Sequence, residues 1–283
     1  MNQHPLVGLI GSGAMGEAII AGLVRNQVTL PERIIASGPR PERAAELNER
    51  YGIQAITENA LAVGKADVVI LAVKPQKLER VLAGLKGKIP AGSVVLSIVA
   101  GASLELMSKG LDHACVVRAM PNTPAQIGQG ITVWMATPDV SPEQVVLIQQ
   151  ILSALGDEIQ VEEENYLDMA TALSGTGPAY VFLFLEALID SGVHLGFPRR
   201  IAEQLVLQTL RGSVEYYSQQ KLHPAALRNQ VTSPGGTSAA ALYYLEKAGF
   251  RTAISRAVWA AYERSQELGK DRQGRDPERK SND

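Results

Sequence analysis

The sequence VGLIGSGAMGEAI, residues 7–19, decides the fold that we expect for the first half of the chain. An apolar run ends at Ile10, and the pattern G-x-G-x-x-G follows directly, at the opening of a predicted helix. In this pattern Gly11 permits a tight turn, Gly13 lets a phosphate approach the backbone, and Gly16 lets helix and strand pack closely. The free N–H groups at the helix start favour negative charge. The stretch therefore predicts a dinucleotide-binding unit with these contacts: Gly11, Ser12, Gly13, Ala14, Met15 and Gly16.

Short apolar runs alternate with amphipathic stretches as far as Val161, which predicts βα units around a parallel sheet. The predicted strands are residues 6–10, 33–36, 67–73, 93–99, 114–118 and 131–136. The predicted helices between them are residues 14–25, 41–51, 75–85 and 104–110. The second helix starts with Pro41 and stops at Gly52, which is the usual pair of helix boundary signals. We expect an α/β, Rossmann-type doubly wound domain over residues 1–163.

Beyond Glu164 the strand signal disappears. Apolar residues at helical spacing predict helices at residues 178–195, 198–219, 237–248 and 251–268. Several of these helices, notably around residues 180–185, are apolar on more than one face and need more cover than one small bundle supplies. We therefore predict an all-α dimerisation domain over residues 164–269, followed by a disordered polar tail, residues 270–283.

Composition narrows the possible partners and the location. The chain has 283 residues and a net charge of −2, with Lys and Arg scattered, which argues against a nucleic-acid partner. The apolar stretch 178–197 contains Glu186, Asp190 and His194, so we expect no membrane span. No basic leader with a cleavage site precedes the first strand. The lone Cys115 fits a structural thiol in a reducing cytoplasm.

The end of the second strand indicates which dinucleotide binds. An NAD enzyme usually has an acidic residue there, about twenty residues after the glycine pattern. This chain has ASGPRPER, residues 36–43, instead. Ser37 and the guanidinium of Arg40 are suited to hydrogen-bond a 2′-phosphate, whereas Arg43 fits a solvated charge at a helix start. The sequence therefore favours NADPH, with NADH as an alternative.

Ligands of open parallel sheets gather at the carboxyl ends of the strands, so the loops there are candidates for chemistry. The loop AVKPQ, residues 72–76, ends a buried strand with Lys74, which we expect to contact the ribose or phosphate of the cofactor unless it is an ordinary surface lysine. The loop IVAG, residues 98–101, supplies small residues that suit a nicotinamide face. The loop RAMPNTP, residues 118–124, places two prolines around a polar pair.

Four strings together resemble the pyrroline-5-carboxylate reductase family: LAVKPQ (71–76), MPNTP (120–124), ALSGTGPAY (172–180) and VTSPGGTS (231–238). The match runs in order from Val7 to about Leu268. The resemblance implies a homo-oligomer formed through the helical domain, with each active site between the cofactor domain of one protomer and helices of the other. It also implies reduction of 1-pyrroline-5-carboxylate to L-proline by NAD(P)H, the last step of proline biosynthesis.

The resemblance also assigns site residues. It implies that Asn59 contacts the nucleotide and that the strand-end loops line the nicotinamide at Val73, Lys74 and Ala100. We also expect Ala72 and Pro75 to bind the cofactor. It implies that the glycine loop near residue 235 holds the substrate carboxylate, through Ser233, Gly235, Gly236, Thr237 and Ser238. This loop stands before an apolar helical pattern, so its free N–H groups suit an anion. Ser238 is our catalytic candidate, because its hydroxyl would hydrogen-bond the ring nitrogen of the substrate. The family usually has threonine at this position.

Other chemistry has little support in the sequence. A protonated cyclic imine is already electrophilic, so its reduction needs an oriented hydride and a carboxylate anchor. The four histidines are scattered outside the motifs: His4, His113, His194 and His223. No Cys/His cluster has metal-ligand spacing, and we interpret the run 162–164, EEE, as a solvated connector. We expect no metal.

Two alternatives stay open on the sequence. The β-hydroxyacid dehydrogenases resemble this layout, but they use a lysine on the helix after a similar glycine motif, where this chain has Val181. A nucleotide-binding protein without catalysis, such as a redox sensor or scaffold, would bind NADPH but would show no proline-dependent reduction of NADP.

Overall fold

The structure is a computed structural model that describes residues 4–273. The described residues form two compact units, one made of residues 4–176 with 261–273, and one made of residues 177–260. The domain boundary predicted at residues 163–164 stays a prediction. Of the tail predicted to start at residue 270, residues 270–273 continue the last helix, and residues 274–283 lie outside the described residues.

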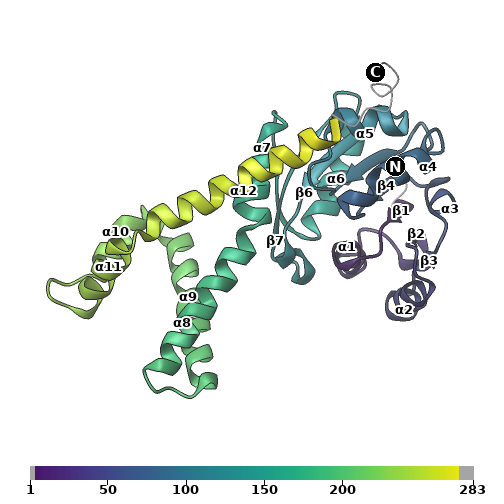
Figure 1. The fold of residues 1–283 in the computed structure, drawn as a ribbon. Coiled ribbons are helices and arrows are strands. Elements are labelled where there is room, and N and C mark those ends of the chain that lie inside the picture. Colours follow the sequence, from purple (N-terminus) through teal and green to yellow (C-terminus); the bar gives the residue numbers. More distant parts are fainter. Residues whose placement is uncertain (1–3, 274–283) are drawn as a thin grey trace. The chain divides into compact units, whose positions relative to one another are not determined.

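The first unit contains one eight-stranded sheet with the order β3-β2-β1-β4-β5-β6-β7-β8. Figure 1 labels β1 to β4, β6 and β7 of this sheet. All neighbouring strands are parallel except β6 and β7. The order reverses beside β1, where Val7 pairs with Ile34 on one side and Val68 on the other. This is the doubly wound arrangement that the sequence predicted. The strands are β1 (Val7–Ile10), β2 (Ile34–Ser37), β3 (Gln54–Ile56), β4 (Val68–Leu71), β5 (Val94–Ser97), β6 (Val116–Met120), β7 (Gly130–Ala136) and β8 (Gly156–Gln160).

Alternate residues of each strand face opposite sides of the sheet, so the unit has two apolar cores. Leu9 of β1 lies in the core under α1, α2 and α6, and Ile10 lies in the core under α3, α4 and α5. The helices of this unit are α1 (Ala14–Arg25), α2 (Pro41–Tyr51), α3 (Asn59–Val63), α4 (Leu78–Leu85), α5 (Leu104–Leu111), α6 (Pro142–Ser153) and α7 (Asn165–Ala170), with 3₁₀ turns at Pro31–Arg33, Pro75–Lys77 and Thr123–Ile127 and a π turn at Thr171–Gly175. The helix predicted at residues 75–85 is thus a 3₁₀ turn followed by α4.

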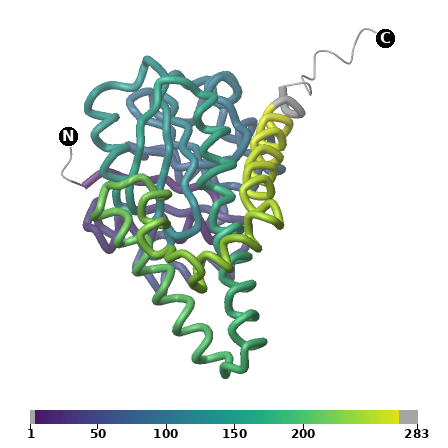
Figure 2. Tube along the Cα trace, turned by 90° about the vertical axis from the view of Figure 1, so that its left-hand side faces the viewer, coloured from purple at the N-terminus to yellow at the C-terminus, as the bar shows by residue number. Residues whose placement is uncertain are grey.

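The second unit is entirely helical. Its helices are α8 (Gly177–His194), α9 (Arg199–Gln220), α10 (Pro224–Gln230), α11 (Thr237–Lys247) and the start of α12 (Phe250–Gln273). The helices α8 and α9 run side by side (Figure 2). A short turn between His194 and Arg199 joins them. A Cβ on Gly192 would lie 2.9 Å from the Cβ of Ala202, so glycine allows this close packing.

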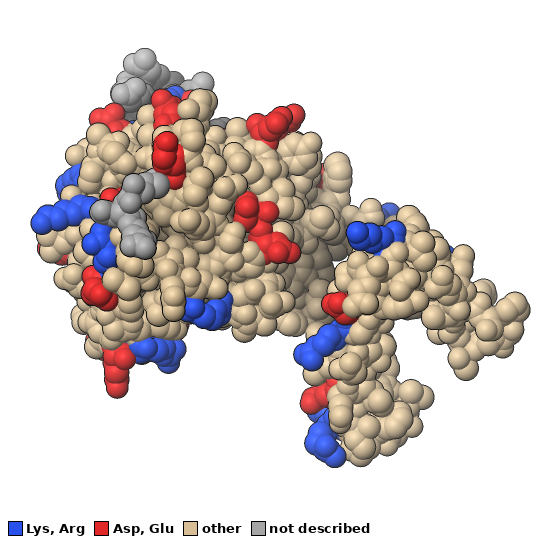
Figure 3. Space-filling view, turned by 180° about the vertical axis from the view of Figure 1, so that it is seen from behind, with Lys and Arg blue, Asp and Glu red and all other residues tan. Residues whose placement is uncertain are grey.

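The helical unit leaves its large apolar side chains exposed. Within residues 177–260 only Ala202 is buried. Phe182, Leu183 and Tyr244 are each more than 60% exposed, and Figure 3 shows broad surfaces of this unit without charged side chains. Exposed apolar areas of this extent mark interaction surfaces. The unit therefore has the surface that the predicted dimer requires.

Candidate dinucleotide and substrate sites

The glycine pattern forms the turn between β1 and α1. Gly11 has φ +111°, and a Cβ there would lie 2.5 Å from the carbonyl oxygen of Ala72. A Cβ on Gly16 would lie 2.1 Å from the carbonyl oxygen of Gly11, so both positions require glycine. Gly13 is exposed, and a Cβ there would meet no atom within 4 Å. No side chain caps the N-terminus of α1, so its first N–H groups face an open place that suits a phosphate.

The second strand ends beside this turn. The backbone N–H of Gly11 donates to the carbonyl oxygen of Ser37 at 2.8 Å. The Ser37 side chain is fully buried and its hydroxyl donates to Oδ1 of Asn59 at 2.8 Å. The predicted nucleotide residues Ser37 and Asn59 therefore contact each other. Arg40 is exposed at the N-cap of α2, where its guanidinium is accessible.

Arg43 is not the solvated charge that the sequence suggested. Its side chain is only 15% exposed. Its Nε donates to the carbonyl oxygen of Ser12 at 3.2 Å, and its Nη atoms pair with the carboxylates of Glu17 and Glu46. Glu46 lies only three residues after Arg43, but the sequence carried no signal for the contact with Glu17, which is 26 residues away.

The strand-end loops of β4 and β5 continue the sheet edge next to Gly11. The N–H of Ala72 donates to the carbonyl oxygen of Ile10 at 2.8 Å, and the N–H of Ile98 donates to that of Leu71 at 3.0 Å. Lys74 is exposed at the N-cap of the 3₁₀ turn that Pro75 begins. The predicted cofactor-binding residues of these two loops all follow strands at this carboxyl edge: Ala72, Val73, Lys74, Pro75 and Ala100.

Two of the four motif strings contact each other within the first unit. The amide nitrogen of Asn122 donates to the carbonyl oxygen of Ser174 at 3.2 Å, and its Oδ1 accepts from the N–H of Ile131 at 3.1 Å. A Cβ on Gly175 would lie 2.7 Å from Cε of Met120. The π turn Thr171–Gly175 contains this contact, and such turns occur frequently at functional sites.

The prediction that residues 162–164 form a solvated acidic connector is wrong for Glu164, which is hydrogen-bonded. Its Oε1 accepts hydrogen bonds from Nη1 of Arg118 at 2.9 Å and from the N–H of Leu104 at 2.8 Å. The Arg118 side chain is 7% exposed, and its Nη2 donates to Oδ1 of Asp168 at 3.0 Å. These groups line a pocket of about 280 Å³ together with Gly101 and other residues: Ser103, Asn165, Gln266 and Gly269. A buried arginine thus ties β6 to α7 beside the loop that contains Ala100.

The second glycine loop precedes α11. Gly235 has φ +70°, a conformation that favours glycine. It is exposed, and a Cβ at this position would meet no atom within 4 Å. Gly236 is the N-cap of α11, and no side chain caps this helix. The N–H of Gly236 donates to the carbonyl oxygen of Ser233 at 3.0 Å. Ser238 lies in the first helical turn. The loop therefore presents free N–H groups, the arrangement expected for binding a carboxylate.

Comparisons with known proteins place the chain in a family. Residues 164–268 match the family model described as pyrroline-5-carboxylate reductase dimerisation, and residues 6–101 match the model described as NADP oxidoreductase coenzyme F420-dependent. The pyrroline-5-carboxylate reductase of Synechocystis sp. is 47% identical over 264 residues, covering 93% of this chain and 98% of that protein. That of Escherichia coli is 37% identical over 266 residues, with the same coverage. The chain belongs to the pyrroline-5-carboxylate reductase family.

Solved reductases of this family have the same fold. The Plasmodium falciparum pyrroline carboxylate reductase with NADP bound has a TM-score of 0.87 and 31% identity, covering 94% of this chain and 99% of that one. The Coxiella burnetii pyrroline-5-carboxylate reductase has a TM-score of 0.85 and 35% identity, covering 93% and 98%. The predicted family, fold class and NAD(P)H-dependent oxidoreductase activity are confirmed. Family membership decides against the β-hydroxyacid dehydrogenase alternative.

The stretch Asn165–His194 of this reductase is long and apolar enough to cross a membrane, by length and composition alone. The charged side chains of Glu186 and Asp190 in this stretch led to the expectation of no membrane span. A single such helix is weak evidence of a membrane protein. The dimerisation model of the family covers the whole stretch, which gives its apolar surface another explanation.

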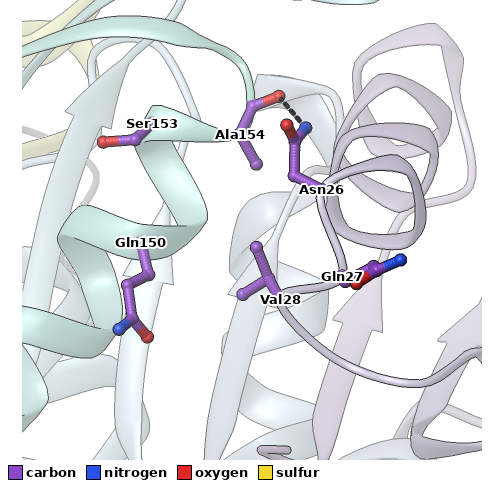
Figure 4. Close-up of a pocket in the computed structure, with 6 residues that line it drawn as sticks. All are labelled: Asn26, Gln27, Val28, Gln150, Ser153 and Ala154. Atoms are coloured by element: carbon purple, nitrogen blue, oxygen red, sulfur yellow. Dashed lines mark hydrogen bonds between the residues drawn. The ribbon is translucent and has the colours of Figure 1, made fainter.

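A second pocket of the reductase, of about 410 Å³, lies between the C-terminal ends of α1 and α6 (Figure 4). Its lining is mostly polar, and the side-chain amide of Asn26 donates to the carbonyl oxygen of Ala154 at 3.3 Å across it. It is lined by Asn26, Gln27, Val28, Gln150, Ser153 and Ala154. None of these residues belongs to the predicted site. Within residues 4–273, no group of three or more His, Cys, Asp or Glu side chains is placed to hold a metal ion.

Proposed function

We propose that this chain reduces the C=N bond of 1-pyrroline-5-carboxylate with NADPH to give L-proline, the last step of proline biosynthesis. The observation that carries the proposal is that a chain of this reductase family has two uncapped helix N-termini opened by glycine, at α1 and at α11. Each is suited to an anion, one to a pyrophosphate and one to a carboxylate.

The cofactor site belongs to the carboxyl edge of β1, β2, β4 and β5. NADPH supplies a hydride there. The turn from Gly11 to Gly16 would hold the pyrophosphate, and the exposed guanidinium of Arg40 would pair with the 2′-phosphate. Ser37 and Asn59 would bind the adjoining ribose, with hydrogen bonds to the ribose in place of the one that Ser37 now donates to Asn59. Val73, Lys74 and Ala100 would line the nicotinamide. The strand β2 ends in Ser37 and lacks the acidic residue that NAD enzymes usually have there, which supports NADPH over NADH.

The substrate site belongs to the loop 233–238. The N–H groups at the start of α11 would bind the carboxylate of the substrate, and Gly235 lets that flat group approach the backbone. The hydroxyl of Ser238 would hydrogen-bond the ring nitrogen. A protonated imine needs little acid–base assistance, so orientation by these groups accounts for most of what the chain itself must supply.

The working enzyme is proposed to be a cytoplasmic homo-oligomer formed through the helical unit. The exposed side chains of Phe182, Leu183 and Tyr244 would be buried against a second copy. Full burial of one such side chain contributes about 1.5 to 3 kcal/mol. Each active site would combine the cofactor edge of one copy with the α11 loop of the other.

The direct test is an assay of the purified chain in both directions, with 1-pyrroline-5-carboxylate and NADPH and with proline and NADP at alkaline pH. We expect turnover in both directions and a higher kcat/KM with NADPH than with NADH. The variant Arg40→Ala should lower this preference. NADPH binding without turnover would refute the proposal, and a preference for NADH that Arg40→Ala leaves unchanged would refute the cofactor assignment.

A further inference from the structure

A cluster of charged side chains joins the first turn of α1 to one face of α2. Its centre is Glu17, whose carboxylate accepts hydrogen bonds from Arg43, from Nη1 of Arg50 at 2.7 Å and from the hydroxyl of Tyr51 at 3.0 Å. Glu46 pairs with both arginines, at 2.6 Å and 3.3 Å. We call these five residues the Glu17 cluster. Two carboxylates and two guanidinium groups cancel in charge, so the cluster acts through geometry more than through net charge.

Arg43 links this cluster to the phosphate-binding turn. Its guanidinium donates in three directions, to Glu17, to Glu46 and, through Nε, to the carbonyl oxygen of Ser12 at 3.2 Å. A planar guanidinium with three such partners has a fixed orientation. The position of the Ser12 carbonyl is therefore determined from α2.

The Ser12 carbonyl belongs to the same peptide plane as the N–H of Gly13. In a trans peptide these two groups point in opposite directions. Holding the carbonyl toward Arg43 thus makes the Gly13 N–H point in the opposite direction, away from Arg43. Glycine neighbours give this peptide unusual freedom, because Gly11 and Gly13 both lack a Cβ. The hydrogen bond from Arg43 to the Ser12 carbonyl would hold this peptide in one orientation before a ligand binds.

We propose that Arg43, held by Glu17, is a positioning residue that presents the Gly13 N–H to the pyrophosphate of the dinucleotide. This inference rests on the cofactor site of the proposed function. It assigns Arg43 a role different from that of Arg40, three residues earlier. The pyrophosphate is common to NADPH and NADH, whereas the 2′-phosphate occurs only in NADPH. Loss of Arg43 must therefore weaken the binding of NADPH and of NADH by the same factor. Loss of Arg40 must weaken the binding of NADPH alone.

The test compares Arg43→Met with Arg40→Met, since methionine keeps an unbranched apolar stem and removes all donors. Dissociation constants of NADPH and NADH are measured by fluorescence titration, and kcat is measured at saturating cofactor. We expect Arg43→Met to raise both dissociation constants by about tenfold, the effect of one charge-assisted hydrogen bond, with kcat within about twofold of the unsubstituted chain. Arg40→Met should raise only the constant for NADPH.

Glu17→Gln provides a second variant that keeps Arg43 but weakens its hold. It should raise the dissociation constants of NADPH and NADH by equal factors, each smaller than the factor for Arg43→Met. If the Arg43→Met chain does not fold, Glu17→Gln serves as the test in its place. A change confined to NADPH would show that Arg43 is a ligand of the 2′-phosphate and would overturn the inference. Unchanged constants would also overturn it. The titration is independent of turnover, so a chain that binds NADPH and reduces no imine would refute the proposed function alone.

Discussion

Replacement of Arg118 by methionine should destabilise the first unit strongly. The Arg118 side chain is 7% exposed and donates to two carboxylates, Glu164 at 2.9 Å and Asp168 at 3.0 Å. After the substitution both carboxylates lose their cation. Each keeps one other donor, Leu104 N–H for Glu164 and the Ser265 hydroxyl for Asp168.

The magnitude follows from burial. Breaking a buried ion pair by removing one partner costs about 3 to 5 kcal/mol. The carboxylates are 31% and 19% exposed, so water offsets part of this loss, and we expect about 3 kcal/mol. At about 2 to 4 °C per kcal/mol, the melting temperature should fall by roughly 6 to 12 °C.

Urea unfolding followed by circular dichroism, at one protein concentration, measures the change. The control is the triple variant Arg118→Met, Glu164→Gln, Asp168→Asn, which removes the charges together with their cation. It should recover most of the stability, since replacing a whole buried charge set is often near neutral. A loss below about 1 kcal/mol for Arg118→Met, or a triple variant as unstable as the single one, would refute the reasoning.

Three further predictions concern single side chains. Ser238→Ala should lower kcat/KM by a factor equivalent to about 1 to 3 kcal/mol, because it removes the proposed donor to the ring nitrogen, and an unchanged value would exclude Ser238 from the mechanism. Burial raises the pKa of Glu17, but hydrogen bonds from Arg43 and Tyr51 outweigh this and hold the pKa below its ordinary value of 4.5. Glu17 should therefore stabilise the fold fully above that pH and lose this contribution as the pH falls through the lowered pKa, so the stability difference between the unsubstituted chain and Glu17→Gln should shrink on acidification. Burial, with Asp139 nearby, raises the pKa of the Cys115 thiol, so alkylation by iodoacetamide at neutral pH should be slower than that of a free cysteine, and an equal rate would contradict the burial.

Local signals in the sequence predicted much of the fold. The helices predicted at residues 14–25 and 41–51 coincide with α1 and α2, because a glycine turn opens the first and Pro41 and Gly52 bound the second. Gly52 has φ +68°, the left-handed conformation expected after a helix. The strand β8 was missed because its sequence GDEIQ carries two acids at a sheet edge, where one face is exposed. The strand β3 has only three residues, too few to show a period.

The candidate site was only partly predictable. The glycine turns at Gly11 and Gly235 are encoded locally, since a positive φ and a following helix leave a recognisable string. The roles of Arg43 and Glu164 are not encoded locally. The partners that define these roles are distant in the sequence: Glu17 is 26 residues from Arg43, and Arg118 is 46 residues from Glu164. Such pairs exist only once the sheet has brought the elements together, so both residues were interpreted as solvated charges.

Complementation between two inactive variants tests the central claim, that a cofactor edge and an α11 loop from different copies share one active site. Gly13 has φ −78° and open space around it, so Gly13→Glu should fold and block the pyrophosphate. Thr237→Glu places a carboxylate at the start of α11, where the helix tolerates it and the substrate does not. Each variant alone should be inactive.

Co-expressed in equal amounts, the two variants should recover about a quarter of the activity of the unsubstituted enzyme, because half of the randomly formed dimers are mixed and each mixed dimer has one intact site of two. Mixed oligomers that form and show no activity would contradict the account.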